Sequence, residues 1–467
     1  MLYNEHYKDD MIYITQLTRN VLFSLGVWPY YNRRRSIREK VWKYFLISIS
    51  YTLLFCVLIP GALFWLIEKR TRVRLQTIPL LLFGFTASGK YGNLIFREKS
   101  IRRCLKHIEE DYKFATVKTR DIMIESAKIG RRLVTLCAIF MYGSGLSFRS
   151  ILPFAKGKIV NSQNITIKPL PCPGYFFSFD VQVSPAYELI FVLQVLSGLV
   201  TYSITTGLCG LAAVFVMHAC GQLKILVNLM RNFAEGQWQE KQEVNRKLAV
   251  MVEHQIRIRR YRHFSFLQSV ENTLQQACLI ELTGCTGVAC LLGYFIIMEW
   301  ENSNSIAMCS YFSALVSMMI NMFMICYTGE QLTVQVKLFI YFPSRFYFAI
   351  IHGKIIIIML FIVIRIKRAF YFIQDNISKQ IVRNISIFFK LFKYMNFFAE
   401  KVARTSCVLE WYRLPRKETR GIVLVIIMSN MPTKLTAGRI MDLSFKTYGD
   451  VVKTVVTYFN MLLRITE

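Results

Sequence analysis

The sequence predicts an all-α, polytopic integral membrane protein with seven transmembrane helices, and three observations lead to this prediction. Of the 467 residues, 54% are apolar and only 19% are charged, whereas a soluble globular domain usually carries about a quarter charged residues. Long apolar runs recur along the chain. The Lys and Arg residues behind the formal net charge of +29 gather in the segments between these runs. That arrangement is typical of the cytosolic loops of a membrane protein and argues against nucleic-acid binding.

Seven apolar runs are long enough to cross a bilayer, which takes about 20 helical residues. They are Tyr44–Ile67, Ile78–Phe96, Arg132–Phe154, Tyr187–His218, Asn272–Met298, Ile306–Tyr327 and the more polar Met441–Ile465. The expected organisation is a cytosolic N-terminal segment (1–43), helices 1–6 (44–327), an atypical insert (336–399), a cytosolic anchor-helix region (400–440) and a last helix (441–467).

The loops predict how the chain is oriented in the membrane. The N-terminal segment, Arg97–Arg132 and Lys224–His263 are basic, and basic loops stay in the cytosol. Asn164 begins an Asn-Ile-Thr glycosylation sequon, which functions only on the lumenal side. The basic residues at 69–74, in the first external turn, break this pattern. We expect a cytosolic N-terminus and an extracellular C-terminus, the reverse of a G-protein-coupled receptor.

Polar side chains recur along one face of the last run at steps that average close to the helical period. They are Asp442, Lys446, Asp450, Lys453, Thr457, Asn460 and Arg464. A charge that faces lipid costs a few kcal/mol, so this polar stripe must face water or protein. The stripe either packs against other helices through ion pairs spaced i,i+4 or lines a water-filled pore. The cytosolic half leaves both interpretations open, and the outer half favours a pore.

Several stretches, in a fixed order, resemble motifs of insect odorant receptors. They are Leu25–Pro29, Leu170–Tyr175 with Ser184–Glu188, Cys326–Leu332, Trp411–Pro415, Met428–Asn430, Lys434–Gly438 and Val451–Thr454. The resemblance implies a tuning receptor in the plasma membrane of olfactory sensory neurons. It also implies that the chain binds a volatile organic ligand and forms a heterotetrameric cation channel with the odorant receptor coreceptor.

The resemblance further implies that the last helix lines the pore. Met461 and Ile465 then occupy the positions of the family's hydrophobic gate, with Asn460 and Arg464 beside them and Thr457 one turn earlier. An apolar ring that loses its water when it narrows is an adequate gate. Arg464 is unusual in a cation path, because a ring of positive charge repels cations.

The same resemblance places the odorant pocket among the second to sixth helices, in the outer half of the membrane. The candidate lining residues are Phe83, Phe85, Ser147, Phe148, Phe191, Tyr294 and Tyr311. Lys90 and Glu281 are the clearest charges inside the apolar runs. Such residues mark a functional site, pair with an opposite charge or extend to the membrane surface, and we favour the two structural interpretations over the functional one.

Other functions fit the sequence less well. A gustatory-type ligand-gated channel and a metabotropic chemoreceptor are the alternatives, and the expected orientation and last helix argue against the second. The 12 cysteines form no CxxC pairs and have no His partners at metal spacing, so no metal site is expected. No catalytic constellation or cofactor motif is visible, and we expect neither an enzyme nor a cofactor.

The block Val336–Ala399 differs from the rest of the chain, because it is rich in Ile, Phe, Lys, Tyr and Asn and contains none of the family motifs. These are residues of A+T-rich codons, and our hypothesis is a retained intron. The rival is an eighth span near Phe346–Ile364. Its apolar run is interrupted by His352 and Lys354, which leaves too short a stretch to cross the bilayer.

The intron hypothesis predicts two transcript populations in antennae, and the main one should lack the codons for 336–399. Sequencing of full-length transcripts measures both. A uniform population that contains the block would contradict the hypothesis.

Overall fold

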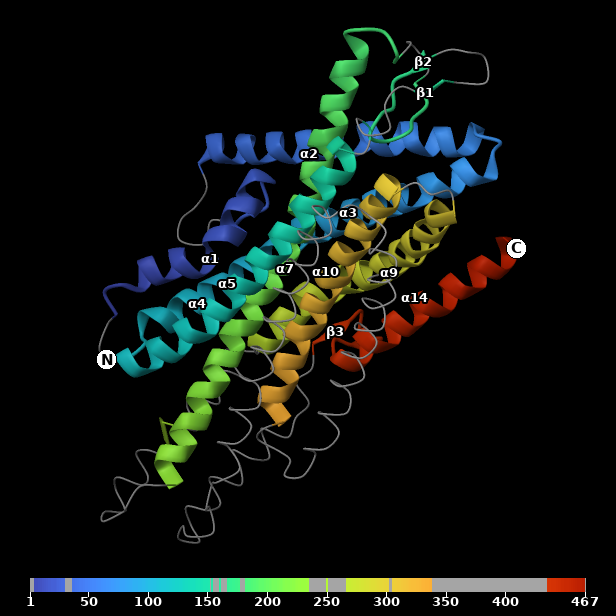
Figure 1. Ribbon diagram of the computed structural model, residues 1–467. Helices are drawn as coiled ribbons and strands as arrows, with labels where there is room; N and C mark the ends of the chain where they lie inside the picture. The colour runs from blue at the N-terminus through green and yellow to red at the C-terminus, as the bar shows by residue number, and fades with distance from the viewer. Residues whose placement is uncertain are drawn as a thin grey trace, which may run out of the picture. The chain divides into compact units, whose positions relative to one another are not determined.

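The computed structural model describes residues 4–29, 36–151, 153, 159–160, 166–176, 181–234, 249–250, 266–301, 305–337 and 435–466. These residues are mostly helical (Figure 1). The helices are α1 (Tyr7–Ser24), α2 (Ile37–Ile67), α3 (Thr71–Phe96), α4 (Glu98–Lys113), α5 (Val117–Leu146), the π-helical turn η1 (Ser147–Ile151), α7 (Ala186–Ala234), α9 (Phe266–Glu301), α10 (Ser305–Lys337) and α14 (Phe445–Thr466). Two short antiparallel pairs join β1 (Ile159–Val160) to β2 (Thr166–Ile167) and β3 (Thr436–Ala437) to β4 (Met441–Asp442).

The chain divides into two compact units. The first contains Met1–Gly221, Phe264–Glu330 and Leu435–Glu467, and the second contains Gln222–His263 and Gln331–Lys434. The described part of the second unit consists of the ends of α7 and α10 and residues 249–250. All contacts discussed below lie within the first unit.

The prediction of an all-α membrane protein is confirmed. By length and composition, five helical stretches of the described chain can cross a membrane, namely Ile37–Ile67, Val117–Ser150, Ala186–Leu226, Phe266–Glu299 and Ser305–Thr333. The remaining two expected runs lie on α3 and α14, which are outside this set of five. Both carry charges within their apolar runs, Lys90 in α3 and Asp450 and Lys453 in α14.

The start of the last helix differs from the prediction. It begins at Phe445, whereas Met441 and Asp442 form β4 and pair with β3, so Asp442 lies on a strand and not on the helix. Two consecutive residues with positive φ, Gly438 and Arg439, reverse the chain between these strands. A hairpin with a three-residue loop leaves no mark on the helical period, so the polar stripe predicted from Asp442 starts on the helix only at Lys446.

Two other expectations change or lie outside the described residues. The expected basic loop Arg97–Arg132 contains the amphipathic helix α4, whose apolar face is buried, and the start of α5. α4 contacts α1 and α9. Three predicted features lie wholly or mostly outside the described residues: Asn164, residues 338–399 of the insert and residues 400–434 of the anchor region. The described end of the anchor region contains the strand Thr436–Ala437.

Ion pairs and caps hold the N-terminal helices in place. Asp10 of α1 is almost buried and accepts two hydrogen bonds of 2.7 Å each from the guanidinium of Arg120 on α5. This two-point geometry fixes both the position and the orientation of α1. Thr116 caps α5 by accepting a hydrogen bond from the backbone N–H of Thr119. The paired charges explain how a polar segment packs against the helix bundle.

α5 and α7 approach closely at a glycine. A Cβ atom at Gly145 would overlap the aromatic ring of Tyr202, whose hydroxyl donates a hydrogen bond of 3.0 Å to the Gly145 carbonyl. Gly143, two residues earlier in the same helix, has nothing within 4 Å of its Cβ position.

We therefore predict opposite effects of the same substitution at these two glycines. Gly145→Ala should destabilise the protein by about 1–3 kcal/mol, because the rigid ring of Tyr202 must move. Gly143→Ala should be neutral or stabilising by up to about 1 kcal/mol, because alanine favours a helix. Thermal unfolding of the detergent-solubilised protein measures both variants. Equal melting temperatures would contradict the close packing.

Candidate functional site

The two charges expected inside the apolar runs pair with each other. Lys90 on α3 and Glu281 on α9 are each 1% exposed, and their side chains form an ion pair. The Lys90 ammonium also donates a hydrogen bond of 2.8 Å to the hydroxyl of Thr205 on α7. Each charge alone would cost several kcal/mol to remove from water, so each needs the other. The pairing alternative raised by the sequence is the one that the structure contains.

A polar amide extends this pair into a network. Asn321 on α10 donates to the second carboxylate oxygen of Glu281, and its own oxygen accepts a hydrogen bond of 2.7 Å from the Cys209 thiol of α7. Cys285, one turn after Glu281, donates to the carboxylate at 3.1 Å. The network therefore joins α3, α7, α9 and α10, and the Glu281 carboxylate holds several donors. A satisfied buried network of this kind fixes one arrangement of its helices.

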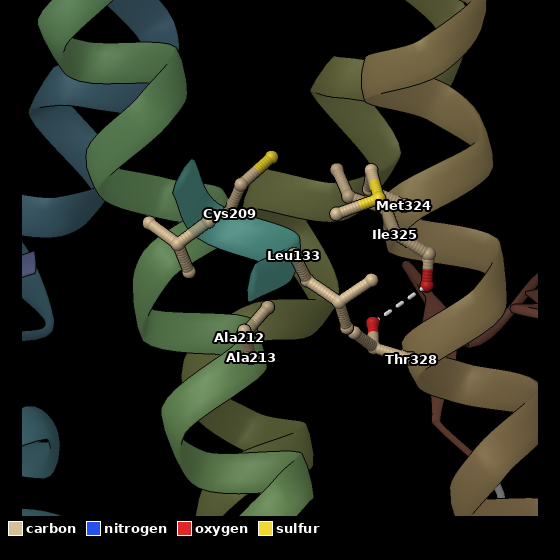
Figure 2. Close-up of a pocket in the computed structure, with 8 residues that line it drawn as sticks. Leu133, Cys209, Ala212, Ala213, Met324, Ile325 and Thr328 are labelled. Atoms are coloured by element: carbon tan, nitrogen blue, oxygen red, sulfur yellow. Dashed lines mark hydrogen bonds between the residues drawn. The ribbon is translucent and has the colours of Figure 1, made fainter. Parts of the chain in front are cut away.

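A small cavity lies beside the network, between α5, α7 and α10 (Figure 2). Its lining residues are Leu133, Val134, Cys209, Ala212, Ala213, Met324, Ile325 and Thr328. Cys209 belongs to both the cavity and the network. The Thr328 hydroxyl is engaged with the Ile325 carbonyl at 2.8 Å, so the wall is almost wholly apolar. The cavity volume of about 10 Å³ holds at most one water molecule, so an odorant-sized ligand does not fit without side-chain movement.

Three of the candidate pocket residues come together in one aromatic cluster. Phe148 of η1 lies 5.8 Å from Tyr311 of α10, centroid to centroid, and Tyr311 lies 5.7 Å from Phe295 of α9. Phe295 in turn contacts Tyr294 at 5.2 Å. Rings at these separations form favourable edge or offset contacts. Aromatic residues from two helices and the π-helical turn thus form one apolar surface.

The other four candidates lie elsewhere. Phe83 is buried against Tyr202, with ring centroids 6.3 Å apart, and its ring lies 5.9 Å from the Lys90 ammonium. Phe191 contacts Tyr187 at 6.1 Å, and the Ser147 hydroxyl donates to the Gly143 carbonyl at 2.7 Å. Phe85 is 55% exposed on the outer surface of the described chain. Of the seven expected pocket residues, three therefore lie in the aromatic cluster, Phe83 lies at the edge of the polar network, and the other three lie apart from both.

Several buried polar residues were not predicted from the sequence, and two of them connect helices near the expected site. One is Asn321, the only amide between Ile306 and Tyr327, and its isolation in an apolar run was the signal. The other is Arg149, which is 5% exposed and donates to the Gln194 carbonyl at 2.5 Å. The Gln194 side chain bonds both the N–H and the carbonyl of Cys172 at 2.9 Å. Arg149 thereby helps to attach the segment before α7 to the helices.

α14 has two different faces. Its apolar face is buried at Phe445, Tyr448, Val452 and Val455, and Val455 packs with Ala289 and Cys290 of α9. The opposite face is exposed at Lys446, Asp450, Lys453 and Thr457. Lys453 and Asp450 form an exposed i,i+3 ion pair of 3.5 Å. In the described chain, these four stripe residues are therefore not packed against other helices.

The candidate gate residues lie in the last two turns of α14. Met461 is 56% exposed, on the part of the helix that follows the stripe. Asn460, Arg464 and Ile465 are also helical, and their side chains lie outside the described set. Thr457 donates from its hydroxyl to the Lys453 carbonyl at 2.9 Å, and the hydroxyl oxygen can still accept hydrogen bonds.

Two buried titratable groups on α4, Cys104 and Tyr112, are held in their neutral forms. Burial raises the pKa of the Cys104 thiol on α4 to about 12, so this thiol stays protonated and unreactive at neutral pH. Burial also raises the pKa of the Tyr112 hydroxyl, with Asp10 and Asp111 adding to the shift. These groups are packed core and offer no nucleophile.

The geometry defines a polytopic helical membrane protein with a buried polar centre and a last helix that exposes a polar face. The family model described as 7tm Odorant receptor matches residues 70–341, which is more than half of the chain, and the chain belongs to this family.

Solved structures show the same fold. The insect olfactory receptor OR5 from Machilis hrabei, in complex with eugenol, is 12% identical and superposes with a TM-score of 0.67, covering 98% of this chain and 100% of the other. A second structure of that receptor gives 12% identity, a TM-score of 0.65 and the same coverage. No curated protein matches the chain significantly. The identity is low, so these structures establish the fold.

The buried network predicts a double-mutant result. Lys90→Met or Glu281→Gln alone should destabilise the protein by about 3–5 kcal/mol, because each substitution leaves the other charge of the pair buried and without its counter-charge. The double variant should recover most of this loss, because the introduced amide at position 281 can still accept from Asn321. Thermal unfolding and surface abundance measure it. Lys106→Met, which breaks an exposed pair with Glu110, should change little and serves as the control. Additive losses in the double variant would contradict the network.

Proposed function

We propose that this protein is an odorant receptor that binds volatile organic molecules and gates a non-selective cation channel, assembled with the odorant receptor coreceptor. It acts in the plasma membrane of olfactory sensory neurons. The observation that carries the proposal is the two-faced α14, which packs its apolar face on its own bundle and leaves Lys446, Asp450, Lys453 and Thr457 exposed. Membership of the odorant receptor family supports it.

The exposed face of α14 is suited to a water-filled pore. A polar face toward lipid is costly, so in a membrane it requires water or a partner subunit. Around a central axis, the same face of each subunit would line an aqueous path. Met461 and Ile465 would form the apolar gate, with Thr457 and Asn460 lining the path beside it. Arg464 would enter the ring only from subunits of this chain, which limits its repulsion of cations in a heteromer.

The ligand site of this proposal centres on the aromatic cluster of Phe148, Tyr294 and Tyr311, with Phe83 near the polar network. Flat apolar walls with a few hydroxyl groups suit a small volatile molecule. The Machilis hrabei receptor was solved with eugenol, a small aromatic compound, which supports the same ligand class here. Phe85, Phe191 and Ser147 are the less central members of the proposed set.

The proposal also includes the orientation predicted from the loops. A cytosolic N-terminus places the start of α14 on the cytosolic side and the gate residues near the outer surface. Asn164 is then lumenal and available for glycosylation. A glycosidase-sensitive mobility shift that Asn164→Gln abolishes would support this orientation.

Co-expression with the coreceptor tests the function. A panel of volatile compounds that includes eugenol should evoke cation currents above those of the coreceptor alone, measured by voltage clamp. No response across a broad panel, with the chain present at the surface, would contradict the receptor role.

Cysteine substitution on the two faces of α14 tests the pore. A charged thiol reagent should block current through Thr457→Cys, because this position is exposed. It should not block Val455→Cys, which is 9% exposed in the native chain and lies on the packed face. The wild type controls for the native cysteines. Equal modification of both variants would contradict the proposed pore face.

A further inference from the structure

The first residue of α14 is bonded to a carboxylate from another helix. The backbone N–H of Phe445 donates a hydrogen bond of 3.1 Å to Glu330, near the end of α10, and the Glu330 side chain is almost buried. The first N–H groups of a helix have no partner within the helix, and its N-terminus carries a partial positive charge. A carboxylate satisfies both needs. Here it comes from a residue 115 positions away in the sequence.

α14 also has a local cap, so the bond from Glu330 is additional. The Ser444 hydroxyl accepts a hydrogen bond of 3.3 Å from the backbone N–H of Thr447, as an N-cap serine does. Ser444 serves the third residue of the helix and Glu330 serves the first. What Glu330 adds is a connection between helices.

Contacts around Glu330 make this connection tight. A Cβ atom at Gly329 would overlap the Leu443 carbonyl, so α10 and the residues before α14 lie backbone to backbone. The ring of Phe323 lies 5.8 Å from Phe445 and 5.5 Å from Tyr448. The start of α14 is therefore held against the last turns of α10 by polar, steric and aromatic contacts together.

The same helix reaches the buried network. Asn321, which bonds Glu281, lies nine positions before Glu330, or about 13 Å along a helix. α9 contributes a second connection, because Gly438 of the hairpin donates to the Gln275 carbonyl at 2.8 Å and Thr436 donates to Glu271 at 2.8 Å. A rigid helix links the network at one end to the base of α14 at the other.

We propose that Glu330 is a positioning residue for channel gating: by capping α14 from α10, it makes the last helix follow movements of the bundle that binds the odorant. The inference rests on the proposed function. A carboxylate interacts favourably with the partial positive charge of a helix N-terminus. This carboxylate lies on α10, the helix that also carries Asn321. Loss of the carboxylate should leave α14 folded through Ser444 and uncouple it from α10.

The test compares Glu330→Ala, Glu330→Gln and the double variant Glu330→Ala/Ser444→Asp, each co-expressed with the coreceptor. The odorant is the panel compound that evokes the largest current from the wild type. The readout is the ratio of the odorant-evoked current to the spontaneous cation current. The surface abundance of each variant is measured alongside. Glu330→Ala should lower this ratio about fivefold, as expected for the loss of one charged hydrogen bond that couples two sites. Glu330→Gln, whose amide oxygen can still accept from Phe445, should lower it less.

Ser444→Asp separates positioning from stability. It supplies a carboxylate at the N-cap of α14 but no link to α10, so it should restore any lost surface abundance and leave the ratio low. Restoration of the ratio as well would overturn the proposal, because Glu330 would then act only as a stabilising cap. If Glu330→Ala fails to reach the surface, the double variant and Glu330→Gln carry the test, and wild-type ratios in both would overturn it.

Glu125→Gln, which neutralises an exposed carboxylate on α5, is the control and should leave the ratio unchanged. A wild-type chain that produces no current above the coreceptor overturns the proposed function and this inference with it. A wild-type current that Glu330→Ala leaves unchanged overturns this inference alone.

Discussion

The ion pair between Lys90 and Glu281 is the constraint on which the rest of the bundle depends. Two charges excluded from water are tolerable only together, so α3 and α9 must meet at one register. Thr205 and Asn321 bring α7 and α10 to the same point. Apolar packing alone allows helices to slide or rotate at small cost, whereas this network fixes their positions. The aromatic cluster and the docking of α14 are built on the helices that it aligns.

The positions of the helices could be predicted from the sequence, whereas the contacts between the helices could not. Run length and hydropathy decide whether a segment spans a membrane, and both are local quantities, so each of the seven expected runs coincides largely with a helix. The hairpin before α14 was missed because a reversal at Gly438 and Arg439 depends on two backbone angles. The pairing of Lys90 with Glu281 joins residues 191 positions apart, and no local pattern encodes such a distance.

The candidate pocket shows the same limit at the level of side chains. Phe83 and Phe85 are two positions apart on α3, and residues at that spacing point to nearly opposite faces of a helix. Phe83 is buried beside Tyr202 and Phe85 is 55% exposed, so the two side chains lie on different faces of α3. Which of the two faces inward depends on the rotation of α3, and Lys90 sets that rotation through its bond to Glu281. The buried charge would have identified the inward face.

The exposed polar face of α14 has a consequence for the stability of the protein in the membrane. A single chain in a bilayer would expose Lys446, Asp450 and Lys453 outside its own bundle, at a cost of a few kcal/mol for each charge that meets lipid. In the proposed channel, subunits enclose water around the helix, and this cost disappears. A chain outside the proposed assembly would keep this cost. The proposed assembly would therefore stabilise the chain itself as well as form a path for ions.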